Sequence, residues 1–431
     1  MTAMTSAERA TEISDHKTCD VLVMGGGPGG AATATFLAMS GLKTVLVERE
    51  SHPRFHIGES LLPGSMPFLE KLGVLDQVRK IGVCKPGAVF ISECGEVERV
   101  FHFKRALLGG PENAYQVRRD EFDELLFRNA TANGVTTLEM TEAKVAKLTP
   151  NAATVHTTDQ DGHTIEWQAR FLIDASGRST VTSKMLQQKR PDPRNTSAAI
   201  FGHFHNIQRK EGPDGGNIRI HLTDPGWVWQ IPLRDGVTSV GLVAPGEYIR
   251  TRESGIEDLF RDHFSRHPHL AQMLDAATPV GALRSTGNFS YRATEATGAS
   301  HLKVGDAYGF LDPIFSTGVH LALMSAFEAA NAVQDCLARP ARASRRLAAY
   351  DRKIRHRLTF VSWFVYAIHL PSFRYLMLNP RNILGVEQAV ISLLAGDFRP
   401  DPRLRGRIAL FKAIRYLTEK LVRVKEQAHA G

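Results

Sequence analysis

A glycine-rich turn between two short apolar segments constrains the fold of this chain more than any other feature of its sequence. Residues 19–24 (CDVLVM) form an apolar run of strand length that leads directly into GGGPGG at 25–30. Residues 29–40 are rich in Ala, Leu and Met, which predicts a helix, and 44–48 (TVLVE) predict a second strand. Strand, glycines, helix and strand in this order predict a βαβ unit, and hence an α/β domain.

The spacing of the glycines gives each of them a physical task. Gly25 permits the tight turn, Gly27 lets the backbone approach a pyrophosphate, and Gly30 allows close packing of helix on strand. Unpaired N–H groups at the positive end of the helix favour phosphate binding. Glu48 ends the second strand about 20 residues later, where a carboxylate accepts ribose hydroxyls and disfavours a 2′-phosphate. The candidate nucleotide-binding residues are therefore Gly25, Gly27, Gly29, Gly30, Glu48 and Arg49.

Three later segments resemble motifs of the hydroxylase-type flavoproteins. RDEFDEL at 119–125 matches R-x-x-F-x-x-L, DASG at 174–177 matches D-A-x-G, and GDA at 305–307 matches the G-D-A motif of those enzymes. The resemblance implies that the nucleotide is FAD. It further implies that Arg119 supports the flavin side of the site, that Asp174 and Gly177 lie near the cofactor, and that Asp306 after Gly305 holds the ribityl chain.

These motifs are spread over residues 20–330, so the segments between them must interrupt the cofactor domain. We expect a hydroxylase-type, glutathione-reductase-like FAD domain made of residues 18–189 and 285–340. Alternating apolar stretches predict an inserted antiparallel β-sheet, the substrate domain, at 190–284. Residues 341–431 are amphipathic and rich in Arg and Leu, which predicts a C-terminal helical region, whereas 1–17 are expected to be disordered.

Three further segments match motifs that are not part of the general hydroxylase-type pattern. Residues 227–232 (WVWQIP) match W-x-W-x-x-P, residues 310–318 (FLDPIFSTG) match F-x-x-P-x-x-S-x-G, and Lys85 follows a GESLLP segment at 58–63. Together these motifs resemble the flavin-dependent halogenases of the tryptophan halogenase superfamily. Because side chains alternate along a strand, Trp227 and Trp229 are expected on one face of the inserted sheet.

The resemblance implies an activity in which reduced FAD and O₂ form a flavin C4a-hydroperoxide that oxidises chloride or bromide to hypohalous acid. Lys85 then relays the halogen to a distant aromatic ring, as a chloramine or by donating a hydrogen bond. Trp227 and Trp229 keep the substrate away from the flavin.

Main-chain N–H groups suit an anion without a charged side chain, and the implied halide-binding residues are Ser316, Thr317 and Gly318. The same residues also suit a cap on a helix at 319–330. Further flavin contacts are implied for Ser60, Pro313, Gly318 and Val319.

The substrate class follows from a departure within the halide motif. Tryptophan halogenases carry a glutamate just before the serine of this motif, whereas this chain has Phe315. Phe315, a candidate substrate-tunnel residue, resembles the pyrrole and phenol halogenases, several of which act on an acyl group tethered to a carrier protein. We therefore expect a small electron-rich aromatic substrate of secondary metabolism, such as antibiotic biosynthesis, either free or bound to an acyl or peptidyl carrier protein. Aromatic residues at 360–375 either wall the aryl pocket or only pack helices.

Other functions stay open at this point. One alternative is an FAD-dependent aromatic hydroxylase, and another is a flavin-dependent isoprenoid reductase or a non-catalytic flavoprotein. Since no second nucleotide-binding fingerprint is visible, we expect a separate flavin reductase to supply the reduced FAD.

Composition narrows the partners. The net charge of +8 over 431 residues lies largely in the C-terminal third, which suits a solvated helical face or an acidic carrier protein, and no nucleic-acid motif accompanies it. The sequence has no long apolar run and no signal peptide, so we expect a cytoplasmic monomer or homodimer without a membrane span. Four widely separated cysteines predict free thiols and no metal site.

Overall fold

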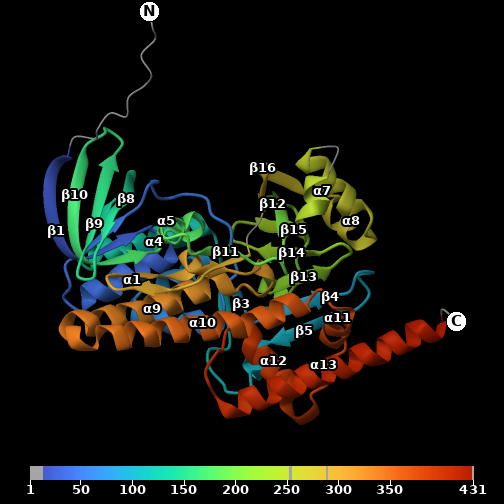
Figure 1. Ribbon diagram of the computed structural model, residues 1–431. Helices are drawn as coiled ribbons and strands as arrows, with labels where there is room; N and C mark the ends of the chain where they lie inside the picture. Colours follow the sequence, from blue (N-terminus) through green and yellow to red (C-terminus); the bar gives the residue numbers. More distant parts are fainter. Residues whose placement is uncertain (1–12, 252–254, 288–289, 430–431) are drawn as a thin grey trace, which may run out of the picture.

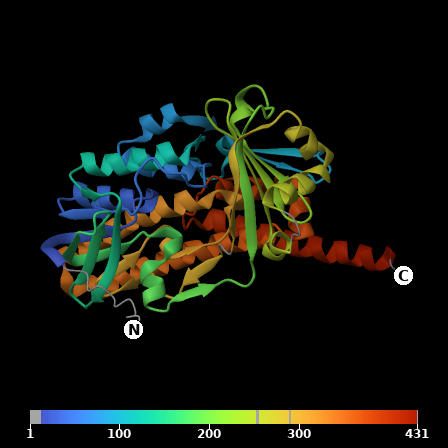
Figure 2. The ribbon, with the colours of Figure 1, turned by 90° about the horizontal axis from the view of Figure 1, so that it is seen from above.

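The computed structural model describes residues 13–251, 255–287 and 290–429. Two large β-sheets stand side by side, and long helices run beneath them (Figures 1 and 2). This is the mixed α/β architecture that the sequence predicts.

The first sheet forms the centre of the cofactor domain. Its strands lie in the order β18-β19-β10-β1-β2-β7, and β8 and β9 extend it beside β10. β1 is parallel to both β2 and β10, and α1 (Pro28–Met39) packs against β1, β2, α4 (Arg119–Ala132) and α9 (Thr317–Ala338). This arrangement confirms the βαβ unit. The strands are β1 (Ile13–Met24), β2 (Thr44–Val47), β7 (Thr136–Leu138), β8 (Thr141–Leu148), β9 (Ala153–Asp159), β10 (Thr164–Asp174), β18 (Thr297–Gly298) and β19 (His301–Lys303).

The N-terminal segment differs from the expectation of disorder over 1–17. Residues 1–12 lie outside the described residues, but 13–17 form the exposed first half of β1. They pair with the start of β10, in the register His16 opposite Glu166 and Lys17 opposite Trp167. Polar side chains on a sheet extension give no apolar run, so hydrophobic patterning misses this strand.

The second sheet has seven strands in the order β16-β12-β15-β14-β13-β4-β5. Its strands are β4 (Gly87–Ile91), β5 (Glu98–His102), β12 (Ser197–His205), β13 (Ile218–Leu222), β14 (Trp227–Pro232), β15 (Thr238–Pro245) and β16 (Thr278–Gly287). The sheet extends beyond the antiparallel sheet expected at 190–284: β4 and β5 come from residues 87–102, and β4 pairs with β13 in parallel. β4 is buried along its whole length, so it lacks the alternation that marks a one-sided strand.

The C-terminal helices join the two sheets. They are α10 (Ala343–Ala367), α11 (Pro371–Leu378), α12 (Val386–Leu394) and α13 (Pro402–His429). α10 packs on α9 below the first sheet, α11 packs on β4 and β5, and α13 packs on α11 and α12. The end of α13 extends beyond the body of the protein (Figure 1).

Smaller elements complete the chain. The remaining strands are β3 (Gly82–Lys85), β6 (Ala114–Val117), β11 (Lys189–Pro191), β17 (Tyr291–Ala293) and β20 (Gly309–Phe310). The remaining helices are α2 (Met66–Lys71), α3 (Leu75–Ile81), α5 (Val181–Met185), α6 (Gly246–Arg250), α7 (Ile256–Ser265) and α8 (Pro268–Leu274). Strand β3 pairs with β6, and its last residue is Lys85.

Histidines fasten α7 and α8 to the second sheet. His221 on β13 stacks on His269, with 5.3 Å between ring centroids, and His263 on α7 lies 5.3 Å from His267. Burial, with the neighbouring His269 and Arg219, lowers the pKa of His221 to about 3. Burial also lowers the pKa of His263 to about 4. These two imidazoles are therefore neutral in the folded protein at pH 5.

Mild acid should destabilise this contact. In the unfolded chain the imidazoles gain protons near their ordinary pKa of 6.5, so the stability they contribute is complete above pH 6.5 and is lost as the pH falls toward 4 and 3. We expect His221→Gln to reduce the fall in melting temperature between pH 7 and pH 5 by about 2 °C. Replacing the exposed His16 by Gln serves as the control, and the same acid sensitivity in all three proteins would contradict the assignment.

Candidate functional site

A cavity of about 1310 Å³ opens between the two sheets. Its walls come from the glycine turn after β1, the loop at 56–60, the inner face of the second sheet and the segment 304–322. It brings together most of the residues that the sequence singled out.

The glycine turn has the geometry of a nucleotide cradle. Gly25 has a φ of +103° and donates its N–H to the carbonyl of Val47 at 2.8 Å. A Cβ on Gly30 would lie 1.8 Å from the carbonyl oxygen of Gly25, so only glycine fits there. Gly27 and Gly29 line the cavity, and a Cβ on Gly27 would meet only one side-chain atom, at 3.7 Å. Gly27 thus faces open space into which the phosphates of a dinucleotide fit.

The acidic end of β2 supports this turn from behind. The Glu48 carboxylate accepts the N–H of Gly26 at 2.7 Å and the N–H of Glu50 at 3.1 Å, and Arg54 lies 3.4 Å from it. Arg49, by contrast, is exposed and lies 3.5 Å from Glu50. The side chains of Glu48 and Arg49 are both absent from the cavity wall among the described residues, so their predicted contacts with the cofactor stay predictions.

The DASG turn at 174–177 contains a carboxylate that holds the turn in shape and a glycine that lines the cavity. Asp174 is fully buried and accepts hydrogen bonds from the backbone and hydroxyl groups of Ser176 and Thr182. It holds the turn in shape and does not itself line the cavity. Gly177 and Gly305, both with a φ of +56°, and Asp306 do line it.

Two charged side chains of this region face the flavin space. Burial raises the pKa of Asp306 to about 6. A hydroxyl donor from a bound ligand would satisfy this carboxyl, as the ribityl assignment requires. Arg119 pairs with Asp123 at 2.7 Å and donates to the carbonyl of Ile57 at 2.8 Å, so it is fixed in the cavity wall.

The predicted halide turn lies at the start of α9. Ser316 adopts the left-handed conformation with a φ of +54°, and its side chain makes no capping hydrogen bond, so the cap expected from its hydroxyl is not formed. Asp312 instead accepts the N–H of Ile314 at 3.0 Å and tightens the turn. Pro313, Ser316, Gly318 and Val319 line the main cavity, whereas Thr317 lines a second, smaller one. The amides at the start of this 22-residue helix suit a bound anion.

Lys85 lies behind the wall of the main cavity. It is 1% exposed, and its Nζ donates to the Ser60 hydroxyl at 2.8 Å and to the carbonyl of Leu61 at 2.9 Å. Burial lowers the pKa of Lys85 to about 7. Ser60 itself lines the cavity, so one hydroxyl connects the lysine to the flavin space.

The two tryptophans of β14 line the same cavity, which confirms that they share one face of the sheet. Their ring centroids are 5.9 Å apart, and Trp229 donates its Nε1–H to Ser239 at 3.1 Å. The Nε1–H of Trp227 is buried without a protein partner among the described residues. A buried donor of this kind fits a ligand that brings an acceptor.

Phe315 lies on the far side of the halide turn, where it lines a second and much narrower cavity, with room for about one water molecule. Phe360, Phe364 and Phe373 from α10 and α11 also line this cavity. Part of the C-terminal aromatic stretch therefore walls a pocket, while Trp363 packs against Phe364, Phe373 and Phe411 instead.

Sequence reasoning missed two charged groups of the site. Glu59 lines the main cavity and bonds through one oxygen to His203 at 2.7 Å, while its other oxygen is buried with no hydrogen-bond partner in the described part of the chain. It stands in the GESLLP segment, where a buried acid beside Ser60 was the available signal. Arg178 also lines the cavity, directly after Gly177 of the DASG turn. His203 gives no signal of its own, because its partner is 144 residues away.

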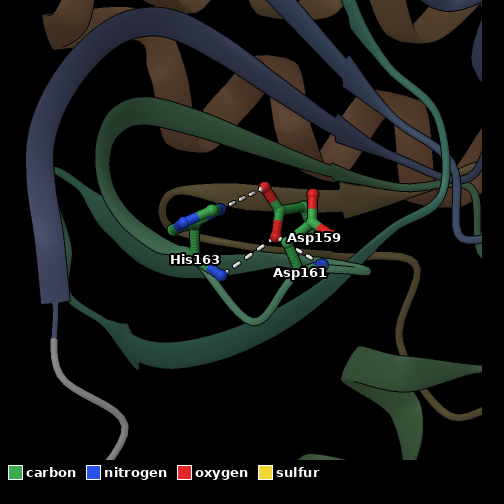
Figure 3. A group of neighbouring side chains, drawn as sticks. All are labelled: Asp159, Asp161 and His163. Carbon is green, nitrogen blue, oxygen red and sulfur yellow. Dashed lines mark hydrogen bonds and ion pairs between the residues drawn. The ribbon is translucent and has the colours of Figure 1, made fainter.

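One group with the spacing of metal ligands occurs among the described residues, at the hairpin that joins β9 and β10 (Figure 3). Asp159 accepts the backbone N–H groups of Asp161 and His163 at 3.0 and 2.9 Å, and its other oxygen lies 3.2 Å from the His163 ring. These bonds belong to a tight polar turn. The group therefore has a structural explanation outside the site.

The fold and the cavity define a flavoprotein of the FAD-binding α/β class. In agreement, the FAD binding domain family model matches residues 18–392. The chain is 33% identical to the flavin-dependent halogenase armH1 and 34% to armH3, both of Armillaria mellea, over 73% of its own length. It covers 64% and 67% of those proteins, so it spans about two thirds of the length of these relatives.

Relatives of similar length give the same result. The chain is 29% identical to the 1H-pyrrole-2-carbonyl-[peptidyl-carrier protein] chlorinase of Pseudomonas fluorescens, over 91% of this chain and 92% of that one. The myxobacterial chondrochloren halogenase CndH superposes with a TM-score of 0.78 at 31% identity, covering 94% of this chain and 97% of that one. A flavoprotein/dehydrogenase from Cytophaga hutchinsonii gives a TM-score of 0.86 at 26% identity, covering 94% and 99%. This chain belongs to the flavin-dependent halogenase family, and its cofactor is FAD.

None of the helices in the described part of the chain combines the length and the hydropathy that a membrane crossing requires.

Proposed function

We propose that this protein uses reduced FAD and O₂ to oxidise chloride or bromide, and that Lys85 transfers the halogen to an electron-rich pyrrole or phenol. One observation carries the proposal: a buried amine with a pKa of about 7 lies one hydroxyl away from the FAD cavity. A lysine in water keeps its proton at neutral pH, whereas this amine exists in both forms.

The cofactor would lie along the glycine turn, with Gly27 and Gly29 at the phosphates, Asp306 at the ribityl chain and Arg119 on the flavin side. Reduced FAD bound there supplies, with O₂, the oxidising power that turns a halide ion into hypohalous acid. The amides of Thr317 and Gly318 at the start of α9 would hold the halide.

Lys85 would act on the hypohalous acid in one of two ways. The neutral amine attacks the halogen, so that an N–X bond forms and the oxygen leaves as water after taking up a proton; the aromatic ring then takes the halogen and returns the amine. Alternatively, the ammonium form donates a hydrogen bond to the hypohalous acid and makes its halogen more electrophilic. Ser60 and Leu61 fix the Nζ atom in either case.

Phe315 limits the substrates. Without a carboxylate beside the ring, proton loss after halogen addition depends on the ring itself, which favours pyrroles and phenols over indoles. The side chains that surround Phe315 in the second cavity carry no charge among the described residues, so this side of the halide turn offers no partner for the charges of a free amino acid.

Mass spectrometry tests this proposal. The purified protein receives FAD, NADH, a separate flavin reductase, chloride or bromide, and phenols and pyrroles that are free or carrier-bound. A product with a halogen isotope pattern is the expected result, and a gain of one oxygen without any halide requirement would favour an aromatic hydroxylase instead.

Trp229→Ala separates the halogenase from the hydroxylase in a second way. Trp229 fills the cavity wall above Gly241, where a Cβ would lie 2.2 Å from the indole ring. Removing the indole should leave at least a third of the halogenation activity and should let some substrate reach the flavin, which adds an oxygenated product. A truncated tryptophan also leaves a void that costs about 3–5 kcal/mol, so Trp229→Leu is measured beside it. Equal loss of halogenation and FAD binding in both variants would give Trp229 a packing role only.

A further inference from the structure

A buried pair of side chains joins the wall of the FAD cavity to the second sheet. The oxygen Oε1 of Glu59 lies 2.7 Å from Nε2 of His203. The Glu59 side chain is 1% exposed, whereas that of His203, on β12, is 14% exposed. One end of this Glu59–His203 pair is therefore closed off from solvent, and the other end is partly open to it.

The second oxygen of Glu59 has room for a ligand. Glu59 lines the FAD cavity, and its Oε2 is buried with no hydrogen-bond partner in the described part of the chain. A buried acceptor of this kind is stable only when a ligand or an ordered water donates to it. A Cβ on the preceding Gly58 would lie 3.1 Å from Arg119, so Glu59 stands at the flavin end of the cavity.

The strand β12 places His203 between this end of the cavity and the protein surface. Side chains alternate along a strand, so His203 shares one face of β12 with Ala199 and Phe201, which line the cavity. On its other side the ring of His203 lies 5.7 Å from the ring of Phe55, which is 36% exposed. The exposed Arg284 covers the ring of Phe55 at 3.8 Å.

Other groups in the cavity wall are poorly placed to move a proton at the flavin end. None of the side chains that β12, β13 and β14 contribute to the wall is titratable; they are Ala199, Phe201, Ile218, Trp227, Trp229 and Ile231. Asp306 is assigned to the ribityl chain, and the guanidinium groups of Arg119 and Arg178 keep their protons. The ring of His56 donates to a main-chain carbonyl at 2.7 Å.

Halide oxidation in this cavity consumes protons. When the anionic form of reduced FAD, O₂ and a halide ion give oxidised FAD, hypohalous acid and water, two protons are taken up. Apolar side chains do not carry protons, so an end of the cavity that they and the cofactor close needs a titratable group to bring protons in.

We propose that the Glu59–His203 pair is a proton relay from solvent to the flavin end of the FAD cavity. Glu59 donates a proton from Oε2, Oε1 takes the proton from Nε2 of His203, and the imidazole regains a proton from solvent. A half turn of the carboxyl group then returns its proton to Oε2. The inference rests on the halide oxidation proposed above and names the route by which that reaction obtains its protons.

Two variants and a matched control test the relay on the full-length protein with FAD. Glu59→Gln keeps the length of the side chain but carries no transferable proton, and His203→Gln breaks the relay at its outer end. The control is Glu166→Gln, because Glu166 on β10 forms a similar pair with His156 at 3.2 Å in the first sheet, away from the cavity.

Proton entry can be measured without turnover. The FAD-loaded protein is reduced without O₂ or halide, and its pH is lowered by rapid mixing. The absorbance of the reduced flavin changes as its anionic form takes up a proton. We expect both variants to slow this change at least tenfold, whereas the control should match the wild type.

Halide oxidation provides the second measurement, with a flavin reductase present and hypohalous acid trapped in solution. It should also fall at least tenfold in both variants, while FAD affinity and melting temperature stay near those of the wild type. If Glu59→Gln does not fold, His203→Gln decides the question from the other end of the pair.

Two results would overturn the relay. The first is flavin protonation at the wild-type rate in both variants. The second is a loss of FAD affinity in Glu59→Gln with normal protonation and normal halide oxidation at saturating FAD, since Oε2 would then only hold the cofactor. A wild type that oxidises no halide would instead refute the halogenase function, and the measurement without O₂ and halide would still decide the relay.

Discussion

Lys85→Met should abolish halogenation of the aromatic substrate while FAD binding and halide oxidation persist. Methionine has about the length of the lysine side chain and fills the same buried space, so the change removes the amine with little loss of packing. We expect aryl halogenation to fall at least 100-fold, since a positioned acid–base or nucleophilic group contributes about that much or more. Aryl halogenation is measured by mass spectrometry of the product, and FAD binding by titration. Halide oxidation is measured by halogenation of monochlorodimedone, which reports hypohalous acid in solution.

Lys303 provides the matched control for this variant. It is also fully buried, burial lowers its pKa to about 8, and its Nζ donates to the carbonyl of Glu295 at 2.8 Å, away from the cavity wall. Lys303→Met should lower the melting temperature without separating aryl halogenation from halide oxidation. If Lys85→Met keeps regioselective halogenation, Lys85 has no part in halogen transfer.

The pH profile of the wild type distinguishes the two roles of Lys85. Its pKa is about 7, so the neutral amine predominates above pH 7 and the ammonium below it. Aryl halogenation that rises through pH 7, relative to halide oxidation, indicates attack by the amine on the halogen. A fall through the same range indicates a hydrogen bond donated by the ammonium.

The parts of the site that sequence predicts well are those held by local geometry. Two local reasons require glycine in this turn, the positive φ of Gly25 and the 1.8 Å that would separate a Cβ on Gly30 from the oxygen of Gly25. The elements β1, α1 and β2 follow in the expected order. The sharing of one face by Trp227 and Trp229 follows from the period of a strand, so it too was predictable.

The parts that sequence does not predict depend on long-range contacts. Glu59 meets His203 across 144 residues, and β4 joins the second sheet from a position more than 100 residues before its partner β13. No local pattern specifies such pairings. At Asp174 a local motif predicts a residue near the cofactor, but the carboxylate accepts hydrogen bonds from the hydroxyl groups of Ser176 and Thr182 instead.

Two alanine substitutions three residues apart in the glycine turn should both weaken FAD binding, but only one of them should destabilise the fold. The Cβ of Gly30→Ala would lie 1.8 Å from the backbone oxygen of Gly25, and backbone cannot move aside as a flexible side chain does. We therefore expect the free energy of unfolding to fall by about 2–3 kcal/mol or more, and FAD binding to be lost with the turn.

Gly27→Ala tests the cradle itself. Gly27 has a φ of −71° and a ψ of −177°, which alanine adopts readily, and its Cβ would project toward the cavity with no atom closer than 3.7 Å. The fold should therefore stay within about 0.5 kcal/mol of the wild type, as for a substitution that meets no neighbour. FAD affinity should nevertheless fall at least tenfold, because the methyl group occupies the space where the backbone approaches the pyrophosphate. Thermal unfolding without FAD and titration with FAD separate the two quantities. Wild-type affinity in Gly27→Ala would mean that the phosphates lie elsewhere in the cavity, whatever Gly30→Ala does to the fold.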